Sequence, residues 1–180
     1  GQIKQRGHRD LARLGVCLGA ADVPVYATLP PAQVAYILRD SGAKVVLVSN
    51  AEQLAKIQEI RSQLPALEVI VSFSGDATGE GVLTLVQLLA RDDAATNSGT
   101  FPGVRTLSAA IERDDLATLI YTSGTTGDPK GVMLTHFNIA SNVAATSKHG
   151  IFDLHPGYIA LSFLPLSHSF ERMVDYYYWW

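Results

Sequence analysis

The sequence is poor in cysteine and contains no long apolar run. Its single cysteine, Cys17, excludes an internal disulfide and a metal site made of cysteines alone, and its apolar neighbours predict a buried thiol. No apolar stretch approaches the roughly 18–20 residues that span a bilayer, and no charged start followed by an apolar core resembles a signal peptide. We therefore expect a protein of the reducing cytoplasm that is neither secreted nor transmembrane.

An excess of positive charge is also missing. The chain has 14 Lys and Arg against 17 Asp and Glu, with a net charge of −3, and its basic residues are scattered. This pattern argues against a nucleic-acid partner, which would require a clustered basic surface. Four histidines, His8, His136, His149 and His155, show no metal-ligand spacing, which argues against a zinc site. No basic amphipathic helix is evident, and peripheral attachment to a membrane stays open.

Short β-rich runs alternate with amphipathic helical patterns along the chain. The helices and strands are long enough for crossover connections, which favours parallel strands covered by helices. The sequence therefore predicts an α/β fold, a doubly wound and mostly parallel sheet with flanking helices. Strands are expected at 23–26, 44–49, 67–73, 116–120 and 158–164, and helices at 11–18, from Pro31 to near Gly42, from Asn50 to Pro65, at 83–90, and from Thr135 to near Gly150. Residues 1–10 read as a frayed or cut beginning and 91–104 as a connection.

The most specific stretch is the hydroxyl- and glycine-rich segment Tyr121–Gly131. Its three glycines permit backbone angles and close approaches that a Cβ would forbid, so that N–H groups can surround an anion. These glycines are Gly124, Gly127 and Gly131. Its hydroxyl groups could donate to phosphate or act as magnesium ligands, and Lys130 adds a compact positive charge. The segment therefore predicts a polyphosphate-binding loop.

The spacing of this loop differs from the common nucleotide-binding motifs. Pro129 separates Gly127 from Lys130 and Gly131 follows the lysine, so the loop is not a Walker A motif, and it is not Gly-x-Gly-x-x-Gly either. By composition alone, the alternative is a flexible turn between two strands. The eleven specified positions shift the balance towards the phosphate loop.

Residues Tyr121–Gly131 resemble the signature loop of the adenylate-forming (AMP-binding) superfamily. A second stretch, Leu164–Arg172, resembles a downstream motif in the long-chain fatty-acid–CoA ligase branch, and a weaker resemblance covers Val23–Ser49. The resemblance implies that 11–180 form part of the large N-terminal adenylation domain. It also implies that the later motifs for adenine and ribose, and the small C-terminal domain, lie outside this chain, which reads as a fragment.

The resemblance implies a reaction and a set of ligands. A fatty-acid carboxylate attacks the α-phosphorus of ATP, and the thiol of coenzyme A then displaces AMP. The loop would hold the leaving pyrophosphate together with Mg²⁺, with Thr122 as a magnesium ligand. The matching cofactor-binding positions are Thr122, Ser123, Gly124, Thr125, Thr126, Gly127 and Lys130. The alternatives are a fatty acyl-AMP ligase, a peptide-synthetase adenylation domain, and a non-catalytic nucleotide-binding or scaffold domain.

His168 has two interpretations. From the residues alone, a histidine in the first turn of a helix, after a Ser167 cap, is a structural or exposed residue. The resemblance instead places it beside the acyl site, near the adenylate, at the carboxyl end of the expected strand 158–164. Glu171 and Arg172 read as helix-surface or ion-pair residues, and the apolar residues 173–180 as core rather than acyl channel.

Overall fold

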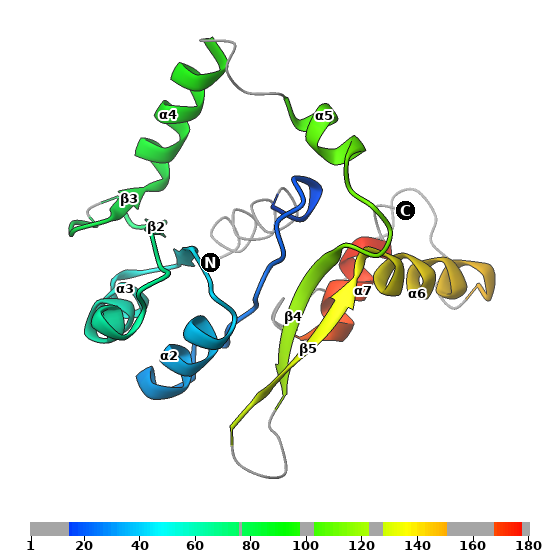
Figure 1. Cartoon of the computed structure of the whole chain (residues 1–180), viewed down its shortest axis with the longest axis horizontal. Coiled ribbons are helices and arrows are strands. Elements are labelled where there is room, and N and C mark those ends of the chain that lie inside the picture. Colours follow the sequence, from blue (N-terminus) through cyan, green and yellow to red (C-terminus); the bar gives the residue numbers. More distant parts are fainter. Residues whose placement is uncertain (1–14, 76, 98–102, 123–127, 151–167, 178–180) are drawn as a thin grey trace.

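The computed structural model describes residues 15–75, 77–97, 103–122, 128–150 and 168–177 (Figure 1). The described strands form two small sheets, one of three strands and one of two. The strands are β1 (Val45–Val48), β2 (Val69–Ser72), β3 (Val82–Thr84), β4 (Leu116–Thr122) and β5 (Lys130–Thr135). The helices are α2 (Pro31–Asp40), α3 (Ala51–Ile60), the 3₁₀ turn η1 (Arg61–Gln63), α4 (Leu85–Asn97), α5 (Val104–Ala109), α6 (His136–Lys148) and α7 (Ser169–Tyr177).

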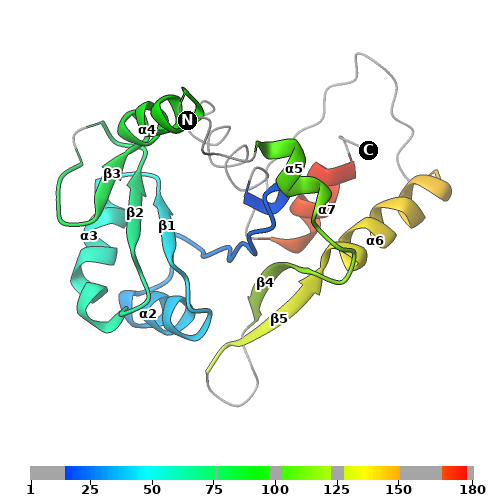
Figure 2. The same cartoon turned by 45° about the horizontal axis from the view of Figure 1, so that its top comes forward.

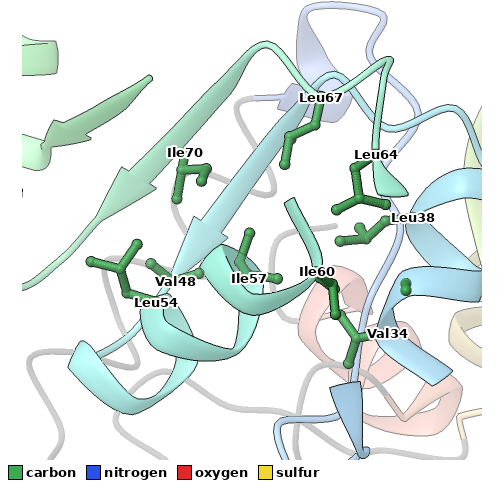
Figure 3. Close-up of a cluster of buried hydrophobic side chains, with 10 residues drawn as sticks. Val34, Leu38, Val48, Leu54, Ile57, Ile60, Leu64, Leu67 and Ile70 are labelled. Carbon is green, nitrogen blue, oxygen red and sulfur yellow. The ribbon is translucent and has the colours of Figure 1, made fainter. Parts of the chain in front are cut away.

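The three-stranded sheet is parallel throughout, in the order β1-β2-β3, as Figure 2 shows. Its buried side chains pack with those of α2 and α3 into one hydrophobic cluster (Figure 3). Ile70 from β2 and Ile57 and Ile60 from α3 are almost inaccessible to solvent. Burial of this apolar surface is the main favourable term in folding of this sheet. The predicted α/β fold with a parallel sheet is thus confirmed.

The helices of this sheet begin and end where local sequence signals predict. Pro31 occupies the first position of α2, where a missing N–H has no cost. After α2, Gly42 has a φ of +64°, and the N–H groups of Gly42 and Ala43 donate to the carbonyls of Arg39 and Leu38. This is a Schellman motif, for which glycine is the favoured residue. Asn50 caps α3 by accepting a hydrogen bond from the Gln53 N–H at 2.9 Å.

The prediction for 83–104 is wrong at its boundaries. Val82–Thr84 is a third parallel strand, and the following helix continues to Asn97 instead of ending at Ala90. Thr84 and Gln87 start this helix by exchanging hydrogen bonds between side chain and backbone. The helix extends because Arg91, Ala94 and Ala95 are strong helix formers, although the added residues carry no apolar period. A short helix that was not predicted, α5, begins at Val104, the last residue of the predicted connection, and ends at Ala109.

Two predictions for the N-terminal part are also corrected. Val23–Tyr26 forms no strand; only Asp22 makes an isolated parallel bridge, with Thr118, and the chain then runs to a turn. The Lys56 ammonium fixes that turn by donating to two backbone carbonyls, those of Ala27 and Leu29. Cys17 is exposed rather than buried. It lies on a helical turn that buries its neighbour Val16 instead.

The second sheet is an antiparallel hairpin of β4 and β5, of which the sequence predicted only the first strand, at 116–120. Its root, the end with Leu116 and Thr135, is firmly held. The backbone of Asp22 exchanges hydrogen bonds with β4, and the Thr118 hydroxyl donates to the Asp22 carbonyl at 3.0 Å. Thr135 ends β5 and caps α6 in a reciprocal capping box with Asn138, as predicted for a helix beginning there.

Several predictions lie outside the described residues. They include the strand at 158–164, the first half of the helix at 11–18, and loop residues Ser123–Gly127. Among the residues described, no helix has both the length and the apolar character needed to cross a membrane.

Candidate nucleotide-phosphate site

The predicted phosphate loop connects the two strands of the hairpin. Thr122 and Lys130 form the last register pair, so they lie opposite each other where the loop leaves and rejoins the sheet. Side chains directly opposite each other in an antiparallel pair project from the same face. The Thr122 and Lys130 side chains therefore project from one face of the hairpin, and both residues are exposed. Ser123–Gly127, the other predicted ligands, lie between them and outside the described residues.

This pair has the chemistry of an anion site open to solvent. The ammonium is a compact charge with three donors, and the hydroxyl both donates and accepts. Phosphate oxygens fit both groups. The Thr122 hydroxyl oxygen also fits the hard oxygen ligands that Mg²⁺ requires, as one ligand beside phosphate and water. Thr122 and Lys130 are thus the described residues that would hold a magnesium–polyphosphate.

Gly131 has a role that its place in the loop motif did not suggest. It pairs with Tyr121 across the hairpin, and a Cβ at Gly131 would lie 3.1 Å from Cζ of the Tyr121 ring. Gly131 is not among the glycines of positive φ. The close approach predicted for this glycine therefore exists, but its partner is the tyrosine ring rather than phosphate.

Tyr121 links the hairpin to helix α2 of the other sheet. Its hydroxyl donates to Oδ2 of Asp40, the last residue of α2, at 2.6 Å, and its ring meets that of Tyr36 edge-on with centroids 6.5 Å apart. In both views α2 lies beside the hairpin (Figures 1 and 2). Partial burial, followed by the hydrogen bond to Asp40 and the charge of that carboxylate, raises the pKa of Tyr121 far above its usual value. Tyr36 and Asp40 lie far from the loop in sequence, so the motif gave no signal for them.

The pKa of Tyr36 depends on charges from both α2 and the loop. Partial burial raises the pKa of Tyr36, and the negative charges of Asp40 and Asp128 raise it further, while Arg39 opposes them. Asp128 is a loop residue, the first one described after Ser123–Gly127, and it is exposed. The carboxylates of Asp40, on α2, and of Asp128, in the loop, therefore both raise the pKa of the Tyr36 phenol.

His168 is exposed and directly precedes α7. Its Nδ1 accepts a hydrogen bond from the Phe170 N–H at 3.2 Å, so the side chain caps a helix that begins at Ser169. The sequence predicted Ser167 as the cap and placed His168 in the first turn. Its predicted place beside the acyl site stays a prediction, because 151–167 lie outside the described residues. Glu171 is buried, with 5% of its surface exposed, which contradicts the helix-surface interpretation. The ion-pair interpretation of Glu171 stays a prediction.

The loop, the hairpin and the parallel sheet define a class of protein. The family of AMP-binding enzymes matches residues 16–180, and the chain belongs to that family. Its relatives include long-chain fatty-acid–CoA ligases. It is 35% identical over 160 residues to Long-chain-fatty-acid–CoA ligase 5 of Rattus norvegicus, covering 85% of this chain and 23% of the relative. It is 34% identical over 167 residues to Long-chain-fatty-acid–CoA ligase FadD15 of Mycobacterium tuberculosis, covering 92% and 26%.

Solved structures agree with this assignment. The N-terminal domain of FACL13 from Mycobacterium tuberculosis, solved with an inhibitor, matches 91% of this chain and 36% of its own with a TM-score of 0.61 and 28% identity. A red-emitting luciferase from Phrixothrix hirtus matches 89% of this chain and 30% of its own with a TM-score of 0.68. At 19% identity that likeness shows the fold alone. The chain spans about a quarter of the length of the curated relatives named above.

Proposed function

We propose that this chain carries the phosphate-binding part of an ATP-dependent long-chain fatty-acid–CoA ligase. The observation that carries the proposal is the exposed pair Thr122 and Lys130 at the base of the signature loop. The identity of 34–35% to long-chain ligases over most of the chain supports the fatty-acid substrate. We further propose that the activity belongs to a longer protein in the cytoplasm, in which 11–180 are part of the adenylation domain.

In the first step, a carboxylate oxygen of the fatty acid forms a bond to the α-phosphorus of ATP, and the bond to the bridging oxygen of pyrophosphate breaks. Negative charge accumulates on the departing pyrophosphate. The Lys130 ammonium and the Thr122 hydroxyl would bind its oxygens, and fixed donors stabilise such charge without reorganising. Bound magnesium would add further charge stabilisation.

In the second step, the thiol sulfur of coenzyme A forms a bond to the acyl carbonyl carbon, and the bond from that carbon to the AMP oxygen breaks. The products are the thioester and AMP, and the thiol proton is lost to solvent or a base. We assign none of the described residues to the binding of coenzyme A. A fatty acyl-AMP ligase, which would pass the acyl group to a carrier protein, is the alternative within the family.

The test uses the longest reading frame that encodes these residues. We expect exchange of labelled pyrophosphate into ATP that depends on a long-chain fatty acid, followed by thioester formation with free coenzyme A. Exchange without a thioester would favour the acyl-AMP ligase. Absence of exchange with any carboxylic acid, from a folded protein, would favour a scaffold domain and contradict the proposal.

We also propose that His168 borders the acyl site. Its Nδ1 accepts the Phe170 N–H, so in the neutral imidazole the proton is on Nε2, which can donate to a carboxylate. His168→Asn keeps a helix-capping acceptor, whereas His168→Ala removes it. We expect both variants to lower pyrophosphate exchange, because both remove the Nε2 donor. If the asparagine variant exchanges pyrophosphate like the wild type, His168 only caps α7.

A further inference from the structure

We propose that Asp40 and Tyr36 of α2 act with Tyr121 as a brace that positions the signature loop for phosphate. We call these three residues, with Gly131, the α2 brace. We treat all four as positioning residues rather than catalytic ones, since the contacts described above join them to one another. The proposal rests on the proposed function, because the loop must bind phosphate for its position to matter.

The first argument is that the hairpin needs support near its loop. A two-stranded hairpin alone is marginally stable in water. At its root, the hairpin is held by the backbone of Asp22 and by the capping box that starts α6. Near the loop, the hydrogen bond from Tyr121 to Asp40 and the ring of Tyr36 supply the contact with a folded element. Tyr121 directly precedes Thr122, so the brace acts one residue from the proposed ligands.

The second argument is the alternation of side chains along a strand. Successive residues of a strand project to opposite faces. Tyr121 and Gly131 therefore project from the face that meets α2, and Thr122 and Lys130 from the other face. The hairpin can be held from one side while its phosphate ligands stay open to solvent on the other, and Gly131 keeps the first side free for the tyrosine ring.

The third argument is the position of Asp40. An acidic residue at the C-terminus of a helix interacts unfavourably with the helix dipole, so α2 gains nothing from Asp40 there. A hydrogen bond from a hydroxyl to a carboxylate at 2.6 Å has the short length of a charge-assisted bond. The Asp40 carboxylate therefore stabilises the contact with the hairpin and does not stabilise α2.

The experiment follows trypsin cleavage after Lys130, which is exposed beside the loop, in the protein from the longest reading frame that encodes this chain. Tyr121→Phe keeps the ring and loses the donor, and Asp40→Asn loses the charged acceptor. Cleavage after Lys148, at the end of α6, serves as the internal reference. Tyr26→Phe and Asp114→Asn are matched controls, because they make the same chemical changes at sites outside the brace.

We expect cleavage after Lys130 to accelerate about three- to tenfold in both brace variants, the range that loss of one solvent-exposed hydrogen bond predicts. Cleavage after Lys148 and the cleavage pattern of both controls should stay unchanged. Asp40→Glu, which keeps a carboxylate, should restore part of the protection. Unchanged cleavage after Lys130 in both brace variants would overturn the brace, and so would equal acceleration at Lys148.

The same assay with MgATP separates the brace from the proposed function. If the loop binds phosphate, MgATP slows cleavage after Lys130 in the wild type, and the brace variants need about three- to tenfold more MgATP for equal protection. Equal MgATP requirements in variants and wild type would overturn the positioning role. Absence of protection in the wild type would contradict the phosphate assignment, whereas the cleavage rates without nucleotide would still decide whether the brace holds the hairpin.

Discussion

At the scale of single residues, Gly131 matters for the side chain that it lacks. A glycine within a strand weakens it, because it loses more entropy on folding and has no side chain to pack. This cost is accepted where another group needs the space, and here the group is the Tyr121 ring. The same position can therefore be favourable or unfavourable for alanine, depending on its neighbour across the hairpin.

We predict that Gly131→Ala destabilises the wild type but stabilises a variant in which Tyr121 is alanine. In the wild type, the new Cβ meets the ring at 3.1 Å, and we expect a loss of about 1 kcal/mol of unfolding free energy. In a Tyr121→Ala background the clash is gone, and the same change should stabilise by about 0.5 kcal/mol. Urea unfolding of the four proteins measures the coupling. Additive effects would show that ring and glycine are independent.

A second prediction concerns the titration of Tyr121. Its raised pKa means that the folded state holds the phenol proton more tightly than the unfolded state does. The stabilisation is therefore complete below the ordinary tyrosine pKa of about 10 and is lost only as pH rises through the higher folded pKa.

Ultraviolet difference titration against Tyr121→Phe isolates this phenol. We expect no tyrosinate signal from Tyr121 as pH passes about 10. In Asp40→Asn the ionisation should move to lower pH, because the neutral amide removes the negative charge beside the phenol. Ionisation of Tyr121 together with the exposed tyrosines would contradict the hydrogen bond to Asp40.

At the scale of elements, the sequence predicted the helix ends that depend on residues close together in the chain. The cap at Asn50, the proline at the start of α2 and the glycine after its end were all readable, because each lies within a few residues of the group it satisfies. Strand β3 and helix α5 were missed because they are short and carry no apolar period. Val23–Tyr26 was wrongly predicted because its composition suits a strand, and pairing depends on a partner that sequence does not reveal.

The cap of α3 gives a prediction at this scale. Asn50→Ala removes the acceptor for the Gln53 N–H, and we expect a loss of about 1 kcal/mol of unfolding free energy. Asn50→Asp keeps an acceptor at the positive end of the helix dipole and should be neutral or slightly stabilising. Urea unfolding distinguishes the two variants. Equal losses from alanine and aspartate would mean that the cap contributes nothing measurable.

At the scale of the whole molecule, the chain belongs to a known family but spans only part of the length of its relatives. It matches the AMP-binding enzymes over residues 16–180 and about a quarter of the length of long-chain ligases. Large apolar side chains are well exposed in the described part, including Val86 on α4 and Met133 on β5.

We predict that the 180-residue chain purified by itself forms no acyl-CoA from ATP, a long-chain fatty acid and coenzyme A. We assign phosphate contacts to Thr122 and Lys130 as a proposal, and we assign none of the described residues to adenine, ribose or coenzyme A. A coupled assay for AMP and thioester checks this, with a complete long-chain ligase as the positive control. Thioester formation by the purified chain would refute the proposal that the activity needs a longer protein.

The hydrogen bond between Asp40 and Tyr121 joins residues 81 positions apart, and this separation affects the order of folding. A hairpin closes in about 1–10 μs, whereas contacts between distant residues must first overcome the entropy of closing a long loop. During synthesis at about 5–20 residues per second, Asp40 leaves the ribosome roughly 4–16 s before Tyr121. Helix α2 therefore has time to dock on its own sheet first, and the later hairpin forms against a surface that is already in place.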